Sequence, residues 1–228
     1  MHSFAEIVAI ATERRGGTKS LEAALAAYRS RPPVEIAAIP GDRLLADMAR
    51  RVFHAGFSWK VIDDKWGAFE AAFDGFDPAR CAAMSEAKFD ALLKDTRIVR
   101  NGAKIRSVQA NGQFLLDLAA EHGSAARFFA DWPDSDYVGL LDIMKNRGNR
   151  LGGETGMWFL RGIGKPAFIV TRDVAAALIR EGVLTRSPSG KGDLALIQAA
   201  FNRWSMESGR DLTAISRILA MSVDGQAR

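Results

Sequence analysis

Apolar positions recur at steps of three and four residues along most of this 228-residue chain. Two such stripes are Leu44, Met48, Val52, Ala55 and Ile62, Trp66, Phe69, Phe73; others are Ile105, Val108, Leu115, Ala119, then Leu140, Leu141, Met144, and Leu194, Ile197, Phe201, Trp204. This spacing places apolar side chains on one face of an α-helix. The two-residue alternation of a half-buried strand is sustained nowhere, so the sequence predicts an all-α protein.

Signals for helix starts and breaks agree with this periodicity. Asp77-Pro78 puts a proline at a first helical position, and Ser85 and Asp211 precede apolar runs as N-cap residues do. Arg31-Pro32-Pro33, with Pro40-Gly41, separates an N-terminal helical piece from the main body. Ser187-Pro188-Ser189-Gly190 sets off the last two helices.

Composition narrows the class of protein further. The 48% of hydrophobic residues can support a sizeable core, whereas no apolar run reaches the eighteen residues of a membrane span. The N-terminus lacks the apolar core of a secretory signal, so we expect a cytoplasmic protein. One cysteine, Cys81, and three scattered histidines offer no metal-ligand spacing. The net charge of +4 permits a polyanionic partner without requiring one.

A block of the chain from Ala55 to Asn111 carries three short motifs. They are Ala55-Gly56-Phe57-Ser58-Trp59, Phe76-Asp77-Pro78 and Ile98-Val99-Arg100-Asn101, the last followed by Lys104-Ile105. This block, about a quarter of the chain, resembles the bacterial 3-methyladenine DNA glycosylase I family. The C-terminal third is similar to the family only loosely, and the first fifty residues hardly at all.

The resemblance implies a fold and a partner. The fold class is all-α, a helix-hairpin-helix DNA glycosylase-like domain over residues 1–228, with two helical lobes around a cleft and a divergent helical segment at residues 1–40. The implied partner is double-stranded DNA, bound by a monomer that uses no cofactor and no membrane. The family's zinc site is absent from this sequence, because its cysteine and histidine ligands are missing at both ends.

Leu160-Arg161-Gly162-Ile163-Gly164-Lys165 has the form of a helix-hairpin-helix turn. Two glycines let the backbone bend so that amides can point at a DNA phosphate, and Lys165 could assist through its charge. Such contacts fix affinity and register without reading bases. The alternative is a plain turn between helices.

Asp173 lies in Thr171-Arg172-Asp173-Val174, which is similar to the segment that bears the catalytic aspartate in the wider superfamily. A carboxylate there would stabilise the oxocarbenium-like sugar that forms as the base leaves. The alternative is that Asp173 is the N-cap of the helix Val174–Arg180.

Trp59 is the candidate for stacking on a flipped base, because the matching tryptophan of the family does so. Phe53 and His54, one turn earlier, could complete the pocket. The alternative is that Trp59 is a core residue. Arg51 falls where the family places the acidic residue that recognises alkylated adenine, so a cation replaces an anion near the pocket; a solvated or DNA-facing Arg51 is the other interpretation.

Four cations and no anions lie between Arg97 and Arg106: Arg97, Arg100, Lys104 and Arg106. This run predicts a phosphate patch, in which Arg100 and Lys104 are candidate DNA ligands, although a charged run can also be a solvated helix face. We therefore expect a DNA glycosylase that hydrolyses the N-glycosidic bond of an alkylated purine in base excision repair. The alternatives are a catalytically inactive helix-hairpin-helix DNA-binding protein and a helical interaction module without DNA.

Overall fold

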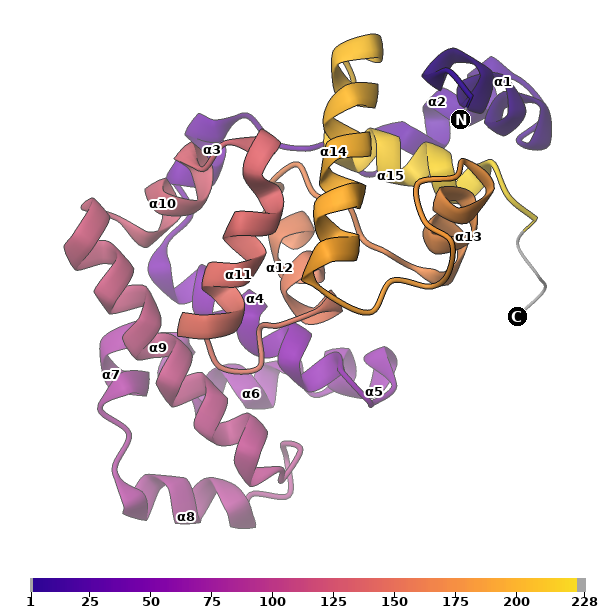
Figure 1. Ribbon diagram of the computed structural model, residues 1–228. Helices are drawn as coiled ribbons and strands as arrows, with labels where there is room; N and C mark the ends of the chain where they lie inside the picture. The colour runs from indigo at the N-terminus through magenta and orange to yellow at the C-terminus, as the bar shows by residue number, and fades with distance from the viewer. Residues whose placement is uncertain (1, 225–228) are drawn as a thin grey trace. The chain divides into compact units, whose positions relative to one another are not determined.

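The computed structural model describes residues 2–224, which form helices and connecting loops and contain no strand (Figure 1). The all-α prediction is confirmed for these residues. Two compact units are distinguished by their internal contacts. The first unit comprises Met1–Arg31, Pro133–Gly139 and Pro166–Arg228, and the second unit comprises Pro32–Trp132 and Leu140–Lys165. The predicted break at Arg31-Pro32 coincides with the first boundary, although the segment before it belongs with the C-terminal residues.

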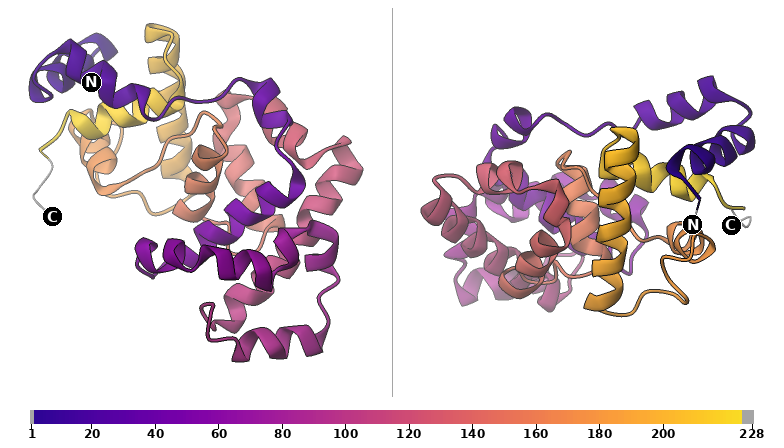
Figure 2. Two further views of the ribbon diagram at one scale, coloured as in Figure 1. Left: turned by 180° about the vertical axis from the view of Figure 1, so that it is seen from behind. Right: turned by 45° about the horizontal axis from the view of Figure 1, so that its top comes forward.

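The second unit contains α3 (Pro33–Ala37), α4 (Gly41–His54), α5 (Trp59–Asp64), α6 (Trp66–Ala72), η1 (Asp74–Phe76), α7 (Pro78–Ala82), α8 (Glu86–Lys94), α9 (Gly102–His122), α10 (Ala125–Asp131) and α12 (Glu154–Gly162). Helix α11 (Tyr137–Arg147) begins in the first unit and continues in the second. Long α9 packs against α4, α7, α8 and α10, and α12 packs against α4 (Figures 1 and 2). At the crossing with α7, a Cβ on Gly112 would lie 2.9 Å from the Pro78 carbonyl oxygen, so only glycine permits this approach.

Aromatic rings form much of the core of the second unit. Phe53, Phe69, Phe73 and Phe76 are buried, and the rings of Phe53 and Phe69 meet edge to face at 4.6 Å. Half-buried Trp66 stacks on Phe69 and Phe76. Burying rings of this size removes a large apolar area from water, which stabilises the helices that carry them.

The first unit contains α1 (Phe4–Arg14), α2 (Thr18–Ala26), η2 (Asp134–Asp136), α13 (Arg172–Arg180), α14 (Lys191–Ser208) and α15 (Leu212–Met221). Helix α15 packs against α1, α2, α13 and α14. The core there includes Tyr137, Phe168, Phe201 and Trp204, and the Tyr137 hydroxyl donates to the Phe168 carbonyl at 3.0 Å.

Three predicted helix starts are confirmed. Asp77, Ser85 and Asp211 accept from the backbone amides of α7, α8 and α15 as N-caps. The Ile62–Phe73 stripe, however, is divided between α5 and α6, because the chain turns at Lys65. Within residues 2–224, no helix is both long enough and apolar enough to span a bilayer.

Candidate functional site

A cavity of about 350 Å³ lies where the chain passes from α4 to α5, facing α12. Its walls are formed by the end of α4, the following loop and the start of α12: Arg51, His54, Ala55, Gly56, Phe57, Ser58, Trp59, Glu154, Thr155 and Trp158. All of these residues belong to the second unit. The volume falls in the range of small-molecule sites.

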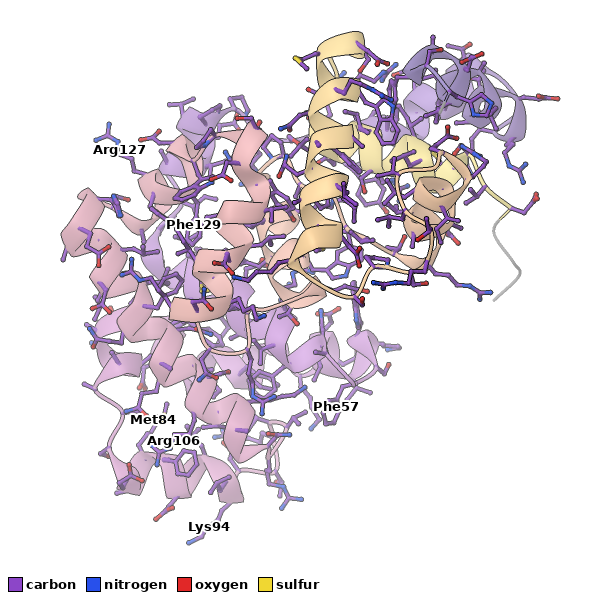
Figure 3. The ribbon with its side chains drawn as sticks, in the orientation of Figure 1. Phe57, Met84, Lys94, Arg106, Arg127 and Phe129 are labelled. Atoms are coloured by element: carbon purple, nitrogen blue, oxygen red, sulfur yellow. The ribbon has the colours of Figure 1, made fainter. Side chains whose placement is uncertain are left out.

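Lys104 of α9 holds the loop that forms this cavity. Its Nζ donates to the Phe53 carbonyl at 3.1 Å and to the Ala55 carbonyl, so it satisfies two oxygens at the end of α4. The same ammonium lies 4.5 Å from the centre of the Phe57 ring. Gly56 takes a φ of 76°, which reverses the chain there. Phe57, labelled in Figure 3, is thereby presented on the surface.

Trp59 forms an exposed aromatic platform in the cavity. Its side chain is 46% exposed although it is one of the largest apolar groups in the chain. The His54 ring stacks on it with centroids 4.7 Å apart and planes 8° apart, and Trp158 meets it edge to face at 5.4 Å. Neighbouring rings hold the indole in place while it stays accessible, which is what stacking on an inserted ring requires. An indole that is 46% exposed is not a core residue, so the alternative interpretation of Trp59 does not fit this geometry.

His54 is buried behind Trp59 and is only 5% exposed. Its Nε2 lies 3.1 Å from an Asp63 carboxylate oxygen. Burial lowers the pKa of His54, and the hydrogen bond to Asp63 offsets part of this effect. A neutral imidazole that donates through Nε2 carries a lone pair on Nδ1, and Nδ1 has no hydrogen-bond partner among residues 2–224.

Arg51 lies in the wall of the cavity and pairs with Asp47 one helical turn earlier. Its Nε and Nη2 donate to the two carboxylate oxygens at 3.4 and 3.1 Å, and the side chains are 17% and 21% exposed. Burial raises the pKa of Asp47, and Arg51 opposes this shift. A Cβ on Gly162 would lie 2.6 Å from both side chains, so this glycine makes room for the ion pair between α4 and α12.

The remaining predicted pocket residue, Phe53, is placed elsewhere. It is fully buried against Phe69 and Phe73 and does not line the cavity. Sequence reasoning also missed three lining residues of α12, Glu154, Thr155 and Trp158. Nothing in their spacing relates them to Trp59, since only the packing of α12 on α4 brings them to it.

The glycine hairpin is the C-terminal cap of α12. The Lys165 amide donates to the Leu160 carbonyl and the Gly164 amide to the Arg161 carbonyl, with Gly164 at a φ of 91°, which is a Schellman motif. Gly162 is the last residue of the helix. The expectation that Gly164 presents its amide to a phosphate is corrected by this bond. The observed hydrogen bonds agree with the alternative interpretation, a plain turn between helices.

The Lys165 side chain is not placed to contact DNA either. It is 4% exposed, and its Nζ donates to the carbonyls of Ala130, at 3.3 Å, and Trp132 at the end of α10. Lys165 thus donates hydrogen bonds to carbonyl oxygens at the C-terminal end of α10, as Lys104 does at the C-terminal end of α4.

Asp173 belongs to the first unit and lies in the first turn of α13. The alternative that it caps this helix is wrong, because Thr171 is the N-cap and accepts from the Val174 amide at 3.3 Å. The half-buried Asp173 carboxylate forms no hydrogen bond or ion pair with the described part of the chain. A catalytic role for Asp173 stays a prediction.

The basic run between Arg97 and Arg106 does not form a continuous phosphate patch. Arg97 pairs with Asp95 at 2.8 Å, Lys104 is 6% exposed, and Arg106 pairs with Glu86 beside α8 (Figure 3). Only Arg100 in this run is exposed without a partner among residues 2–224. The sequence could not show this, because three of the four cations are engaged by residues outside the run or by its own preceding aspartate.

Two further exposed cations of the second unit, Lys145 and Arg150, have no partner in the described part of the chain. Arg150 lies in the loop between α11 and α12 at a φ of 59°, which is rare for a residue with a side chain. Asn111 fixes this loop, since its side chain donates to the Asn149 carbonyl at 3.1 Å and accepts from the Asn149 amide at 2.7 Å.

The zinc of the family that the sequence resembles does not fit here. No group of three or more histidine, cysteine, aspartate and glutamate side chains within residues 2–224 is placed to hold a metal ion. The one thiol, Cys81, donates to the Phe73 carbonyl at 3.3 Å, and burial raises its pKa to about 12. A thiol that stays protonated is a poor metal ligand.

Known proteins resemble the part of the chain that forms one side of this cavity, from Arg51 to Trp59. Residues 41–139 match the family model described as methyladenine glycosylase. A stretch of 64 residues is 34% identical to DNA-3-methyladenine glycosylase 1 of Escherichia coli and covers 28% of this chain. A stretch of 62 residues is 31% identical to DNA-3-methyladenine glycosylase of Haemophilus influenzae and covers 27%. Each match spans 34% of the relative's length.

Solved structures show the same fold. A variant of 3-methyladenine DNA glycosylase I in complex with 3-methyladenine aligns with a TM-score of 0.52 and 24% identity, over 60% of this chain and 81% of that one. The enzyme from Staphylococcus aureus gives the same score and identity over 60% and 80%. Residues 41–139 are therefore similar to the methyladenine glycosylase family, and the chain shares the fold of 3-methyladenine DNA glycosylase I.

Proposed function

We propose that this protein is a DNA glycosylase, which hydrolyses the N-glycosidic bond of a damaged base in duplex DNA. The observation that carries the proposal is the Trp59 platform. A large aromatic side chain is held by His54 and Trp158, yet it remains 46% exposed beside a cavity of about 350 Å³. An enzyme that acts on a base needs such a surface, because the base must leave the stack and be held elsewhere.

The family supports the same proposal. The matched relatives are named DNA-3-methyladenine glycosylases, and the matched residues 41–139 include the loop that carries Trp59. By similarity, an N-alkylated purine is the first substrate to test. DNA would be held at its backbone by exposed cations of the second unit, for which Arg100, Lys145 and Arg150 are the candidates.

A carboxylate would stabilise the positive charge that develops on the sugar. Two candidates exist. Asp173 corresponds to the catalytic aspartate that the sequence resemblance implies, and Glu154 is a carboxylate in the wall of the cavity itself. Base excision repair in the cytoplasm by a monomer is part of this proposal.

The test is release of free base from duplexes that each contain one damaged base, measured with the purified chain and with Trp59→Ala. We expect Trp59→Ala to lower release by on the order of tenfold to a hundredfold, because stacking of one base contributes about 1–3 kcal/mol. Val61→Ala is the matched control, since Val61 is exposed in the same helix but does not line the cavity.

Two results would contradict the proposal. Release that is equal for the parent chain and Trp59→Ala would remove the platform from the site. Binding of duplex DNA with no release of any base would favour the alternative, a catalytically inactive DNA-binding protein.

A further inference from the structure

The charge of the cavity wall bears on which base it can hold. Arg51 is a lining residue and is 17% exposed. Its guanidinium has five N–H donors, of which two are used by Asp47. Asp47 does not line the cavity. Three guanidinium N–H groups of this lining residue therefore have no partner among residues 2–224, and the carboxylate that pairs with Arg51 is not part of the wall.

One carboxylate also lines the cavity, but it faces water. Glu154 is exposed at the start of α12, so solvent and salt screen its charge. Arg51 is mostly buried and is screened less. Four other charged groups lie near the wall. Asp47 pairs with Arg51, the Lys104 ammonium binds the Ala55 carbonyl, and Arg50 and Asp63 form an ion pair at 3.7 Å. Of the two charged lining residues, the less screened one is thus the cation Arg51, whose partner Asp47 does not line the cavity.

The polar groups around the platform favour a ligand that accepts hydrogen bonds. Arg51 can only donate, and the hydroxyls of Ser58 and Thr155 can donate as well. A flat heteroaromatic ring that carries carbonyl oxygens matches these donors, and it can stack on Trp59.

We infer that the cavity selects a neutral base with a ring carbonyl, such as hypoxanthine or uracil, over a base that carries a positive charge. This inference rests on the proposed function, since it names the substrate class of the same site. Such bases arise when hydrolytic deamination replaces an exocyclic amino group by a carbonyl.

The chemistry of base release also favours a guanidinium beside a neutral base. The glycosidic bond breaks with its electron pair going to the base, water adds its hydroxyl to the sugar carbon, and the remaining proton of that water ends on the base. A neutral base gains negative charge as the bond breaks, much of it on a carbonyl oxygen. A guanidinium at that oxygen stabilises the transition state, whereas it gives no such help to a base that leaves from a cationic state.

The experiment compares release of hypoxanthine, uracil and N-alkylated adenine from otherwise identical duplexes. We expect the parent chain to release hypoxanthine or uracil at least tenfold faster than the alkylated base. Arg51→Gln should lower that release at least tenfold, so that the preference over the alkylated base is lost. Arg127→Gln is the matched control, because it removes one positive charge from an exposed position of α10 in the same unit.

Binding of the free bases, followed by tryptophan fluorescence of the folded variants, keeps the test independent of catalysis. Weaker binding of hypoxanthine to Arg51→Gln than to Arg127→Gln supports the inference. Faster release of the alkylated base by the parent chain, unaffected by Arg51→Gln, would overturn the inference and leave the proposed function intact. Release and binding of no base at all would overturn both.

Discussion

Replacing Lys104 by methionine tests whether this lysine builds the site or binds DNA. In the sequence it belongs to a basic run, yet in the structure it is 6% exposed and donates to the Phe53 and Ala55 carbonyls. Methionine keeps an unbranched apolar stem of similar length and removes the charge. The two carbonyls at the end of α4 would then lose their donor.

The magnitude follows from these contacts. Each hydrogen bond from a charged donor contributes about 1.5–3 kcal/mol to stability. Burial of the ammonium opposes this contribution and lowers the pKa of Lys104, and the substitution removes that cost. We expect a net loss of about 2–4 kcal/mol in the free energy of unfolding. For a chain of this size the loss corresponds to a decrease in Tm of about 4–16 °C.

The assays are thermal unfolding and the salt dependence of duplex binding. Arg100→Met is the control, because Arg100 is exposed and lies on the same stretch of chain. We expect Arg100→Met to change the free energy of unfolding by less than about 0.5 kcal/mol. Its binding to duplex DNA should depend less steeply on salt than that of the parent chain. An unchanged Tm for Lys104→Met, together with a weaker salt dependence, would refute the structural role and restore Lys104 as a phosphate ligand.

Three other substitutions test separate parts of the account. Gly164→Ala should cost about 1 kcal/mol of stability, since its φ is 91°, and should lower DNA affinity no more than Gly123→Ala, which carries the same strain at the end of α9; selective loss of DNA binding by Gly164→Ala would restore the hairpin contact. Between pH 7 and pH 5, His54→Asn should lose less stability in urea unfolding than the parent chain. The lowered pKa of His54 in the folded state means that the unfolded state takes up the proton first as the pH falls, which favours unfolding of the parent. Equal losses would show that His54 does not cause the pH dependence. Asp173→Asn should retain its Tm, as Thr171 is the cap, and reduce base release if the carboxylate is catalytic, whereas unchanged release would leave Glu154 as the candidate.

Local patterns predicted the helices well. Periodicity identified α4, and the capping roles of Asp77, Ser85 and Asp211 follow from side chains that reach amides only three residues away. Such interactions depend only on a few consecutive residues, so the local sequence is enough to predict them. The Ile62–Phe73 stripe does not correspond to one helix, because its apolar spacing continues across the turn at Lys65 that separates α5 from α6.

The site was less predictable, because it depends on partners distant in sequence. Trp59 and Arg51 were identified through the resemblance, and both line the cavity. Trp158 lies about a hundred positions further on, and no pattern connects it to them. The sequence predicts DNA ligands at Lys104 and Lys165, because it shows their charge but not their burial at the ends of helices.

The central claim, that the Trp59 cavity receives a base, is tested most directly by following the indole N–H signals of the tryptophans by NMR during titration with hypoxanthine. Trp59→Phe and Trp158→Phe spectra assign the two signals of the cavity. We predict that these signals shift in a saturable way, while those of Trp66 and Trp204, which do not line the cavity, stay in place. Shifts confined to Trp66 or Trp204, or saturable binding that leaves the Trp59 signal unmoved, would contradict the account.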